Sequence, residues 1–454
     1  MTIIQMKEAL KHNSTTSEQL VADCLAKIAE NSHLNAVIEI NPGALEIARA
    51  CDASADKSGV LHGIPVLLKD NVTTGDKMAT SAGSVALAQN IAKYDAIAAA
   101  NLRCAGAIII GKANMTEFAN YMCDFRKDER MPNGYSSRGG QTMHPTHPDA
   151  DPSGSSTGSA VAVAAGLVPA AIGSETYGSI ISPSQACGIV GLKPTDGLIS
   201  KDGVVPISFT LDTLGPMATC VEDVALLMTA MTGKQFDFAY KPADITVGVC
   251  CVGMDNAKWM QGTGEGWRVA NEGLAAKMKQ LGMKVIDLPD DDIAQYAEAR
   301  DDSFIFPLMR YEFQYAMDNY LAAQKNPDIP QNLREIIKYN ERHSDIALKY
   351  GQGNLIAAAE IGKDWQTRPE YVAALTQRAA AQDALDVYFD RHGIDVIMMM
   401  SAHCGLAAAT GFPGITFPLA TQENGRPAGC LLMARRMGED VLLSAARLLQ
   451  ATKT

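Results

Sequence analysis

The chain has 454 residues, of which 47% are hydrophobic and 20% charged, a composition typical of an ordinary globular protein with an extensive buried core. Its formal net charge of −12 argues against a surface that binds nucleic acid or an anionic membrane. The ten cysteines are irregularly spaced and include no Cys-x-x-Cys pair, which favours free thiols in a reducing cytoplasm over a disulfide framework.

The N-terminal segment predicts helices rather than a targeting signal. Its first residues, MTIIQMKEALKHN, carry charges within the first turns and lack the apolar segment of a signal peptide, so we expect a cytoplasmic protein. No apolar run in the chain is long enough to span a bilayer. Helices are expected at residues 3–11, from a capping box at Thr16 to about Asn31, and at 44–55.

Buried strands are predicted next. The runs 64–68 and 107–111 are wholly apolar, as parallel strands covered on both faces are, and residues 95–105 between them have a helical pattern. A strand–helix–strand order favours a doubly wound sheet. Further strands are expected at 170–172 and 188–192. The run Thr219–Glu222 resembles a second capping box, for a helix that ends before Gly233.

The second half of the chain predicts additional strands and a long helical region. Strands are expected at 245–251 and 284–288, with a helix at 265–281 between them. Residues 291–390 look mostly helical and contain no motif, so they are the predicted substrate-specificity region. Strands follow at 395–400, 414–418 and 428–433, with a last helix at 440–449. We therefore expect one α/β domain over 1–454, with a mixed, largely parallel central sheet between helical layers.

Two turns rich in small residues lie between Pro152 and Pro194. The first is Gly154-Ser155-Ser156-Thr157-Gly158, and the second is Thr176-Tyr177-Gly178-Ser179, with 24 residues separating the first serine, Ser155, from Ser179. Such turns let backbone amides approach a ligand closely. The apolar runs 160–166 and 168–172 between the turns argue against a flexible Gly/Ser linker.

Together with the upstream run Gly63-Ile64-Pro65-Val66-Leu67-Leu68-Lys69-Asp70, these turns resemble the amidase signature family, over residues 16–233 and 411–450. Its members hydrolyse amides with a serine, a second serine on a cis peptide bond, and a lysine. The resemblance implies that Ser179 is the nucleophile, Ser155 the cis serine and Lys69 the base, within a signature core at 61–235. It also implies an oxyanion hole made by the backbone N–H groups of Thr176, Tyr177, Gly178 and Ser179. No cofactor and no metal are implied.

The proposed base must be neutral to accept a proton. Burial lowers the pKa of a lysine because it disfavours the charged form. Lys69 ends a fully apolar run, so we expect this desolvation. A carboxylate close to Lys69 would raise the pKa again, and Asp70 is the next residue in the chain.

Two positions depart from the family pattern. Tyr177 stands where the family often has glycine, so its ring is expected to narrow or line the pocket. Ile181 stands where the family usually has arginine, so any pairing of that arginine with the acid matching Glu175 is missing here. The segment 133–141 resembles a segment found in those members of the family that are similar to peptide amidases.

These features predict an enzyme that hydrolyses a small or peptide amide to an acid plus ammonia or an amine, through an acyl-enzyme on serine. The first alternative is the glutaminase-type subunit of a tRNA-dependent amidotransferase, and another is a non-catalytic scaffold with the same fold. The oligomeric state is open, with a homodimer among the options.

Two local patterns offer competing sites. The first turn also fits G-x-S-x-G, which would make Ser156 the nucleophile of an α/β-hydrolase with a histidine such as His403. His144 and His147 could indicate a metal site, but Pro145 and Pro148 interrupt the helix on which paired ligands usually lie.

Overall fold

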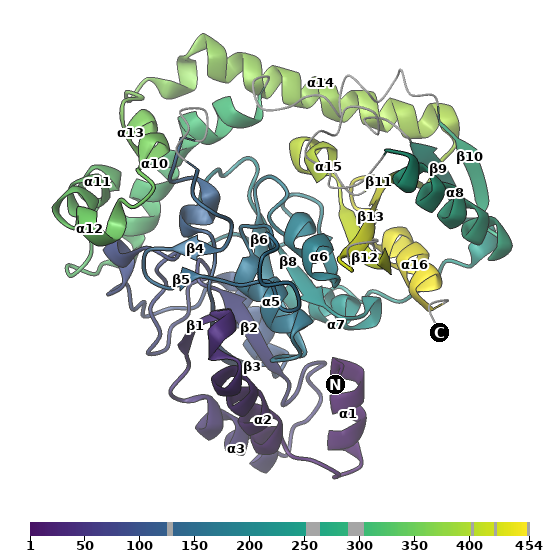
Figure 1. Cartoon of the computed structure of the whole chain (residues 1–454), viewed down its shortest axis with the longest axis horizontal. Helices are drawn as coiled ribbons and strands as arrows, with labels where there is room; N and C mark the ends of the chain where they lie inside the picture. The colour runs from purple at the N-terminus through teal and green to yellow at the C-terminus, as the bar shows by residue number, and fades with distance from the viewer. Residues whose placement is uncertain (125–129, 251–263, 289–303, 401–403, 422–424, 452–454) are drawn as a thin grey trace.

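The computed structural model describes residues 1–124, 130–250, 264–288, 304–400, 404–421 and 425–451, and its centre is one 11-stranded sheet (Figure 1). The strands lie in the order β1-β3-β2-β6-β8-β7-β12-β13-β11-β9-β10. Their bounds are β1 Val37–Ile40, β2 Pro65–Lys69, β3 Ile108–Ala113, β6 Ala170–Glu175, β7 Val190–Lys193, β8 Thr213–Ala218, β9 Thr246–Cys250, β10 Lys284–Asp287, β11 Val396–Met400, β12 Gly414–Thr421 and β13 Pro427–Ala434. A separate small hairpin consists of β4 (Tyr135–Ser136) and β5 (Gly140–Gln141).

The α/β class and the mixed sheet are confirmed, but the sheet is not largely parallel. Parallel pairing is confined to two groups of three strands, β3-β2-β6 and β11-β9-β10. The strands between these groups pair antiparallel, as does β1 with β3. The connection from β12 to β13 spans only residues 422–426, and a connection this short can join only antiparallel neighbours.

Helices lie on both sides of the sheet. Their bounds are α1 Ile3–Lys11, α2 Ser17–Glu30, α3 Ala44–Ala53, α4 Ile97–Cys104, α5 Thr157–Ala164, α6 Ile181–Cys187, α7 Val221–Thr232, α8 Gly264–Gln280, α10 Ile305–Gln324, α11 Leu333–Arg342, α12 Ser344–Ala347, α13 Gly353–Ala359, α14 Pro369–His392, α15 Cys404–Thr410 and α16 Glu439–Gln450. The helices predicted from the first 55 residues, and those at 95–105, 265–281 and 440–449, are confirmed to within about two residues at each end.

One predicted helix start is wrong in its detail. Thr16 caps α2 as expected, because its hydroxyl accepts a hydrogen bond from the Gln19 amide at 3.1 Å. In α7, however, Cys220 rather than Thr219 is the N-cap, and its side chain makes no capping hydrogen bond. The first amide of α7, that of Val221, instead donates to Gln450 Oε1 of α16 at 2.8 Å. A distant side chain thus satisfies the helix end that a local box was expected to satisfy.

The side chains of β2 alternate between the two faces of the sheet. Val66 and Leu68 join the core that includes α1, α4, α7 and α16, whereas Leu67 joins the core that includes α3 and α5. Lys69 is two residues beyond Leu67, so it points to the α5 face. The alternation of the strand therefore aims Lys69 at the segment that begins α5.

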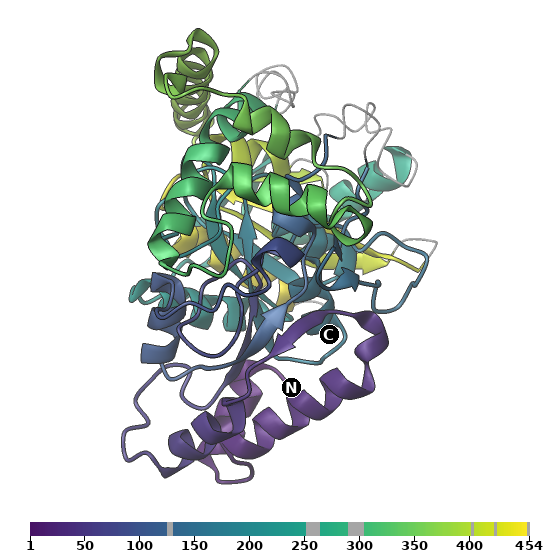
Figure 2. The ribbon, with the colours of Figure 1, turned by 90° about the vertical axis from the view of Figure 1, so that its left-hand side faces the viewer.

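The described part of the predicted specificity region is helical, as expected; residues 291–303 lie outside the described residues. Helices α10, α11, α13 and α14 share a hydrophobic core with Met115, Phe118 and Leu211. Figure 2 shows these helices at the opposite end of the molecule from α2 and α3. None of the helices in the described part of the chain combines the length and apolar character that crossing a bilayer requires.

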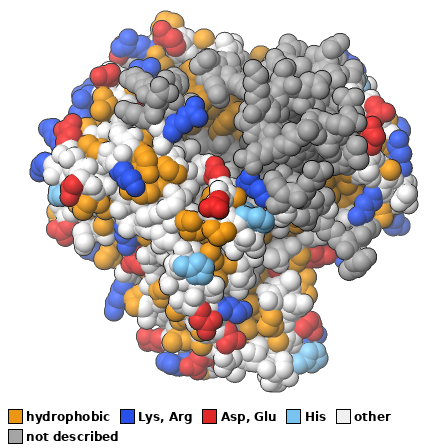
Figure 3. Space-filling view, viewed as in Figure 1, with side chains coloured by type: hydrophobic (Ala, Val, Ile, Leu, Met, Phe, Trp, Pro, Cys, Tyr) orange, Lys and Arg blue, Asp and Glu red, His pale blue; other side chains and the backbone are white. Residues whose placement is uncertain are grey.

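The surface shows no concentration of one charge on the face drawn in Figure 3. Basic, acidic and hydrophobic side chains alternate over the part of that face whose residues are described. The thiols of Cys24, Cys51, Cys104, Cys187 and Cys220 are free.

Candidate active site

Lys69 is the last residue of β2 and is completely buried. Its Nζ lies 2.8 Å from Ser155 Oγ, 2.9 Å from Ser174 Oγ and 3.1 Å from the Ser174 carbonyl oxygen. Three acceptors match the three donors of an ammonium group. The structure therefore brings together two of the predicted site residues, Lys69 and Ser155, and adds Ser174, which the sequence analysis missed.

Ser155 lies in the turn that leads into α5. The peptide bond between Gly154 and Ser155 is cis, as the resemblance implied. The Ser155 carbonyl accepts a hydrogen bond from the Thr116 amide at 3.1 Å. A Cβ atom on Gly154 would lie 2.5 Å from Thr116 Oγ1, so only glycine fits before this serine.

Ser179 lies in the loop that joins β6 to α6. Gly178 has a φ of 83°, a conformation in which glycine is favoured, and it places Ser179 at the entry to the helix. The Ser156 amide donates to the Ser179 carbonyl at 3.2 Å, so a backbone hydrogen bond joins the two predicted turns. Both serines are within the described residues, and no hydrogen bond joins the hydroxyls of Ser155 and Ser179 in this structure.

Two buried carboxylates fix the loop 176–179 at its ends. At its start, the Thr176 hydroxyl donates to Asp212 Oδ1 at 2.6 Å. At its end, the amides of Ile180 and Ile181 donate to Glu175 Oε2 at 2.7 and 3.0 Å. Burial raises the pKa of both carboxyl groups, and the hydrogen bonds that they accept oppose that effect. The loop carrying the predicted oxyanion-hole amides is thus held by fixed acceptors.

Burial lowers the pKa of Lys69 to about 7, while the carboxylates of Asp212 and Glu175 act in the opposite direction. Desolvation is the larger effect because the ammonium group is shielded from water on every side. The lowered pKa favours the neutral amine, which is the form that can accept a proton.

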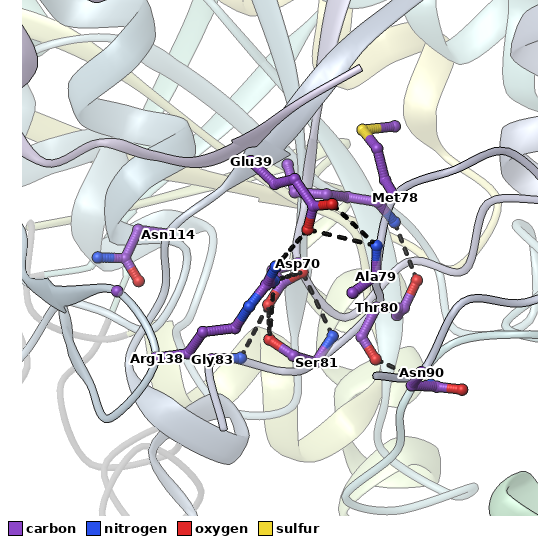
Figure 4. A network of polar contacts seen from close by, with 12 residues as sticks. Glu39, Asp70, Met78, Ala79, Thr80, Ser81, Gly83, Asn90, Asn114 and Arg138 are labelled. Carbon is purple, nitrogen blue, oxygen red and sulfur yellow. Dashed lines mark hydrogen bonds and ion pairs between the residues drawn. The ribbon is translucent and has the colours of Figure 1, made fainter. Parts of the chain in front are cut away.

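Asp70 belongs to a separate polar network, shown in Figure 4. Its carboxylate accepts hydrogen bonds from the Ser81 hydroxyl and, at 3.0 Å, from the Gly83 amide, and it lies 3.7 Å from Arg138 Nη1. Arg138 also pairs with Glu39. The segment 133–141, which resembles peptide amidases, therefore docks through Arg138 onto the acid that follows the proposed base.

Two further residues at the site were not predicted. Asn71 Nδ2 donates to Ser174 Oγ at 2.9 Å, so Asn71 and Lys69 share one acceptor. Asn71 follows Lys69 by two residues, so both side chains reach Ser174 on the same face of the sheet. That spacing is the sequence signal that could have identified Asn71 as a site residue. Asp212 lies in a loop without a motif, and nothing in the sequence marks it.

The competing nucleophile, Ser156, is buried in a structural role. Its hydroxyl donates to the Ser174 carbonyl at 3.0 Å and accepts from the Ser174 amide at 3.2 Å. These bonds fasten the first turn to β6, and they occupy the hydroxyl as both donor and acceptor. His403, the histidine that this alternative would need, lies outside the described residues.

The histidine pair has an ordinary structural environment. His144 Nε2 lies 3.0 Å from the Ala186 carbonyl, and its ring is 5.3 Å from that of His147 between centroids. Within the described part of the chain, no group of three or more His, Cys, Asp or Glu residues is arranged to hold a metal ion.

The two departures from the family pattern have separate environments. Tyr177 packs against the core shared with the helical region, and a Cβ atom on Gly405 of α15 would lie 2.7 Å from its hydroxyl oxygen. The side chain of Ile181 is fully buried in an apolar cluster with Phe389 and Leu406. The Ile181 side chain thus belongs to this apolar core, while Glu175 is held through backbone amides.

The amidase family model matches residues 19–443, and the chain belongs to the amidase signature family. A probable amidase from Arabidopsis thaliana is 31% identical over 98% of this chain and 88% of that protein. The solved structure of the native peptide amidase from Stenotrophomonas maltophilia is similar with a TM-score of 0.89 and 31% identity, over 100% of this chain and 97% of that one. A glutamyl-tRNA(Gln) amidotransferase subunit from Deinococcus radiodurans is 40% identical, but only over 51% of this chain and 46% of that protein. The protein is therefore an amidase-family hydrolase that acts on amide C–N bonds.

Proposed function

We propose that the protein hydrolyses a carboxamide through an acyl-enzyme on Ser179, with Ser155 and Lys69 as the proton relay. The observation that carries this proposal is the 2.8 Å contact between Lys69 Nζ and Ser155 Oγ in a fully buried setting. Serine is a weak nucleophile unless a neighbouring base removes its proton. A buried lysine with a pKa lowered to about 7 can serve as that base.

In the first half of the reaction, Ser179 Oγ attacks the carbonyl carbon, and its proton passes through the Ser155 hydroxyl to Lys69 Nζ. The backbone N–H groups of Thr176, Tyr177, Gly178 and Ser179 stabilise the negative charge on the tetrahedral oxygen. The relay returns the proton to the nitrogen, the C–N bond breaks, and ammonia or an amine leaves. Hydrogen bonds between catalytic groups are often long in a free enzyme and tighten when substrate binds, so a relay can form without a resting bond between the two serines.

In the second half, water attacks the acyl-enzyme by the same route. The relay takes a proton from the water and returns it to Ser179 Oγ as the acid is released. The net reaction converts an amide and water into a carboxylic acid and ammonia or an amine.

For the substrate we propose a peptide that ends in a carboxamide, or a small amide of similar shape. Two observations support this choice: similarity to the Stenotrophomonas maltophilia peptide amidase extends over the whole chain, and segment 133–141 resembles peptide-amidase-like members. Similarity to the amidotransferase subunit, by contrast, covers only 51% of this chain.

The test compares Ser179→Ala with Ser156→Ala on a panel of short aliphatic, aromatic and C-terminal peptide amides, with ammonia release as the readout. Loss of Ser179 should reduce turnover at least about a thousandfold and prevent labelling by a fluorophosphonate probe. Ser156→Ala should retain labelling, with a smaller loss of activity. A fully active Ser179→Ala enzyme would refute the assignment.

The amidotransferase alternative is favoured by the higher identity to that relative over half of the chain. It has its own test. Size-exclusion chromatography of the isolated chain is combined with a glutaminase assay. Glutamine hydrolysis that depends on added partner proteins, with no turnover of the amide panel, would replace the peptide-amide proposal.

A further inference from the structure

We propose that Glu312 of α10 is a positioning residue for the reaction at Ser179, acting through the loop 207–212. The proposal rests on the proposed role of the loop 176–179 and extends it to a residue of the motif-free helical region. A continuous series of hydrogen bonds from Glu312 to Thr176 carries the inference.

Glu312 is a fully buried carboxylate whose partners are all donors. Oε2 accepts from the Ser208 hydroxyl and, at 3.0 Å, from the Thr210 amide. Oε1 accepts from the Thr210 hydroxyl and, at 2.9 Å, from the Tyr371 hydroxyl of α14. The two oxygens of Glu312 thus accept four hydrogen bonds, one from a backbone amide and three from hydroxyl groups.

The loop that Glu312 holds is also closed by its own internal bonds. Ser208 Oγ accepts from the amides of Thr210 and Leu211, at 3.2 and 3.0 Å. At the end of the loop, Asp212 Oδ2 accepts from the amides of Ile207 and Ser208, at 2.8 and 3.0 Å. Ser208 therefore contacts both acids: its hydroxyl donates to Glu312, and its amide donates to Asp212.

The last step reaches the loop that carries Ser179. Asp212 Oδ1 accepts from the Thr176 hydroxyl, and Thr176 is the first residue of the proposed oxyanion hole. Asp212, Thr176, Ser174 and Asn71 are among the residues that line a small cavity of about 10 Å³, room for about one water molecule. Because the hydrogen bond between Asp212 and Thr176 is only 2.6 Å long, a shift of Asp212 moves Thr176 as well.

The outer side of the loop is held by the helical region as well. The Phe209 ring lies 5.8 Å from Trp365 and 6.4 Å from Tyr315 between centroids. These contacts keep the loop 207–212 against the helices, and Glu312 is the residue of α10 that contacts its backbone, at the Thr210 amide. On the other side, Lys201 Nζ donates to the Phe209 carbonyl and, at 3.3 Å, to the Asp212 carbonyl. The geometry therefore assigns Glu312 a positioning role: it holds the loop 207–212, and Asp212 of that loop holds Thr176.

The test begins with Glu312→Gln, which preserves volume but removes the charge and replaces one accepting oxygen by an NH₂ group that cannot accept the hydrogen bonds made there. We expect kcat to fall about tenfold while KM changes less than about twofold, because misplaced oxyanion donors weaken binding of the transition state more than of the substrate. The rate of fluorophosphonate labelling should fall in parallel with kcat. Unchanged kcat in the folded variant, or a rise in KM alone, would overturn the proposal.

A double-mutant cycle with Thr176→Val shows whether the two residues act through one another. If Glu312 acts through Asp212 and Thr176, the double variant should lose clearly less activity than the product of the two single losses. Independent, multiplicative losses would contradict this route. Should Glu312→Gln fail to fold, Ser208→Ala takes its place in the same cycle, with the same expected result.

The matched control is Asp223→Asn. Asp223 is another fully buried carboxylate, and it accepts from the amides of Ile3 and Ile4 at the start of α1. This variant should lower the melting temperature without changing kcat, which separates positioning from a general loss of stability. Ser179→Ala separates the two proposals: if it is inactive while Glu312→Gln is unaffected, only the inference about Glu312 fails.

Discussion

Lys69 and Asp70 are consecutive residues, yet their side chains belong to separate hydrogen-bond networks. Lys69 contacts Ser155 and Ser174, whereas Asp70 is held by Ser81 and Gly83 and lies near Arg138. Adjacent side chains of an extended segment point to opposite faces. The Asp70 carboxylate therefore points away from the Lys69 ammonium group and does not reverse the lowering of the Lys69 pKa by burial. The groups that oppose the lowered pKa of Lys69 are the more distant Asp212 and Glu175.

The first prediction concerns the pH dependence of hydrolysis. Lys69 accepts a proton only when neutral, and its pKa is lowered to about 7, so kcat/KM should rise with pH through about 7 and remain level above it. An unperturbed histidine titrates near about 6.5, so the midpoint alone does not identify the base. Lys69→Ala should lose about 10²–10⁴-fold in kcat/KM, and Lys69→Arg should not restore it because guanidinium stays protonated.

Two controls accompany this measurement. His403→Ala should leave the chemical step largely intact; a larger loss than that of Lys69→Ala would contradict the lysine mechanism. Burial also raises the pKa of Glu117 to about 7, against the hydrogen bonds from Ser137. Glu117→Gln should therefore keep the same midpoint, and a profile that loses its slope in this variant would identify Glu117 as the titrating group.

Ile181→Arg should destabilise the protein without raising its activity on neutral amides. The side chain at this position lies in an apolar cluster, where an unpaired guanidinium costs about 3–5 kcal/mol. Ile181→Val is the matched control, with an expected cost of about 0.5–1.5 kcal/mol. Melting temperatures and turnover of a neutral amide are measured for both. Faster turnover by the arginine variant would contradict this account.

Gly405→Ala should disturb Tyr177 and, through it, the loop 176–179. The added Cβ would lie 2.7 Å from the Tyr177 hydroxyl oxygen, a clash that costs about 1–3 kcal/mol. In a Tyr177→Phe background the nearest remaining ring carbons are at 3.3 Å, so the additional loss of melting temperature and kcat should be smaller. Gly273→Ala, at a helical glycine with open space around it, is the control and should preserve both. Equal losses in the two Tyr177 backgrounds would exclude the contact as the cause.

Asp223→Ala should detach the start of α1. The amides of Ile3 and Ile4 donate to this carboxylate at 2.7 and 3.2 Å, and the change leaves them without their acceptor. We expect a loss of about 1–3 kcal/mol, seen as a lower melting temperature and faster proteolysis of the first residues. Unchanged proteolysis at the N-terminus would show that α1 is held by its other contacts, which are its apolar packing and the hydrogen bond from Lys7 Nζ to the Val60 carbonyl.

The sequence predicted local features well and long-range ones poorly. The strand before Lys69 and the two serine turns were found because their residue types follow one another in the chain. Strand β8 was missed because Gly215 and Pro216 interrupt its pattern; a Cβ on Gly215 would lie 2.0 Å from the Leu192 carbonyl oxygen, so close strand contact requires the glycine.

The site residues that the sequence analysis missed are defined by contacts with residues far away in the sequence. Asp212 contacts Thr176 across 36 positions, and Glu312 contacts Ser208 across 104. No periodicity or short motif records such contacts. The faulty capping box at Thr219 has the same origin, because the amide of Val221 is satisfied by Gln450 from the other end of the chain.

The bond between α1 and Asp223 also bears on the order in which the molecule is assembled during synthesis. The acceptor for the amides of Ile3 and Ile4 is 220 and 219 residues away, about half of the chain. Helix α1 is therefore synthesised 219 residues or more before the carboxylate that accepts its first hydrogen bonds. Throughout that interval Ile3 and Met6, both buried in the finished protein, are open to chaperones and to neighbouring nascent chains.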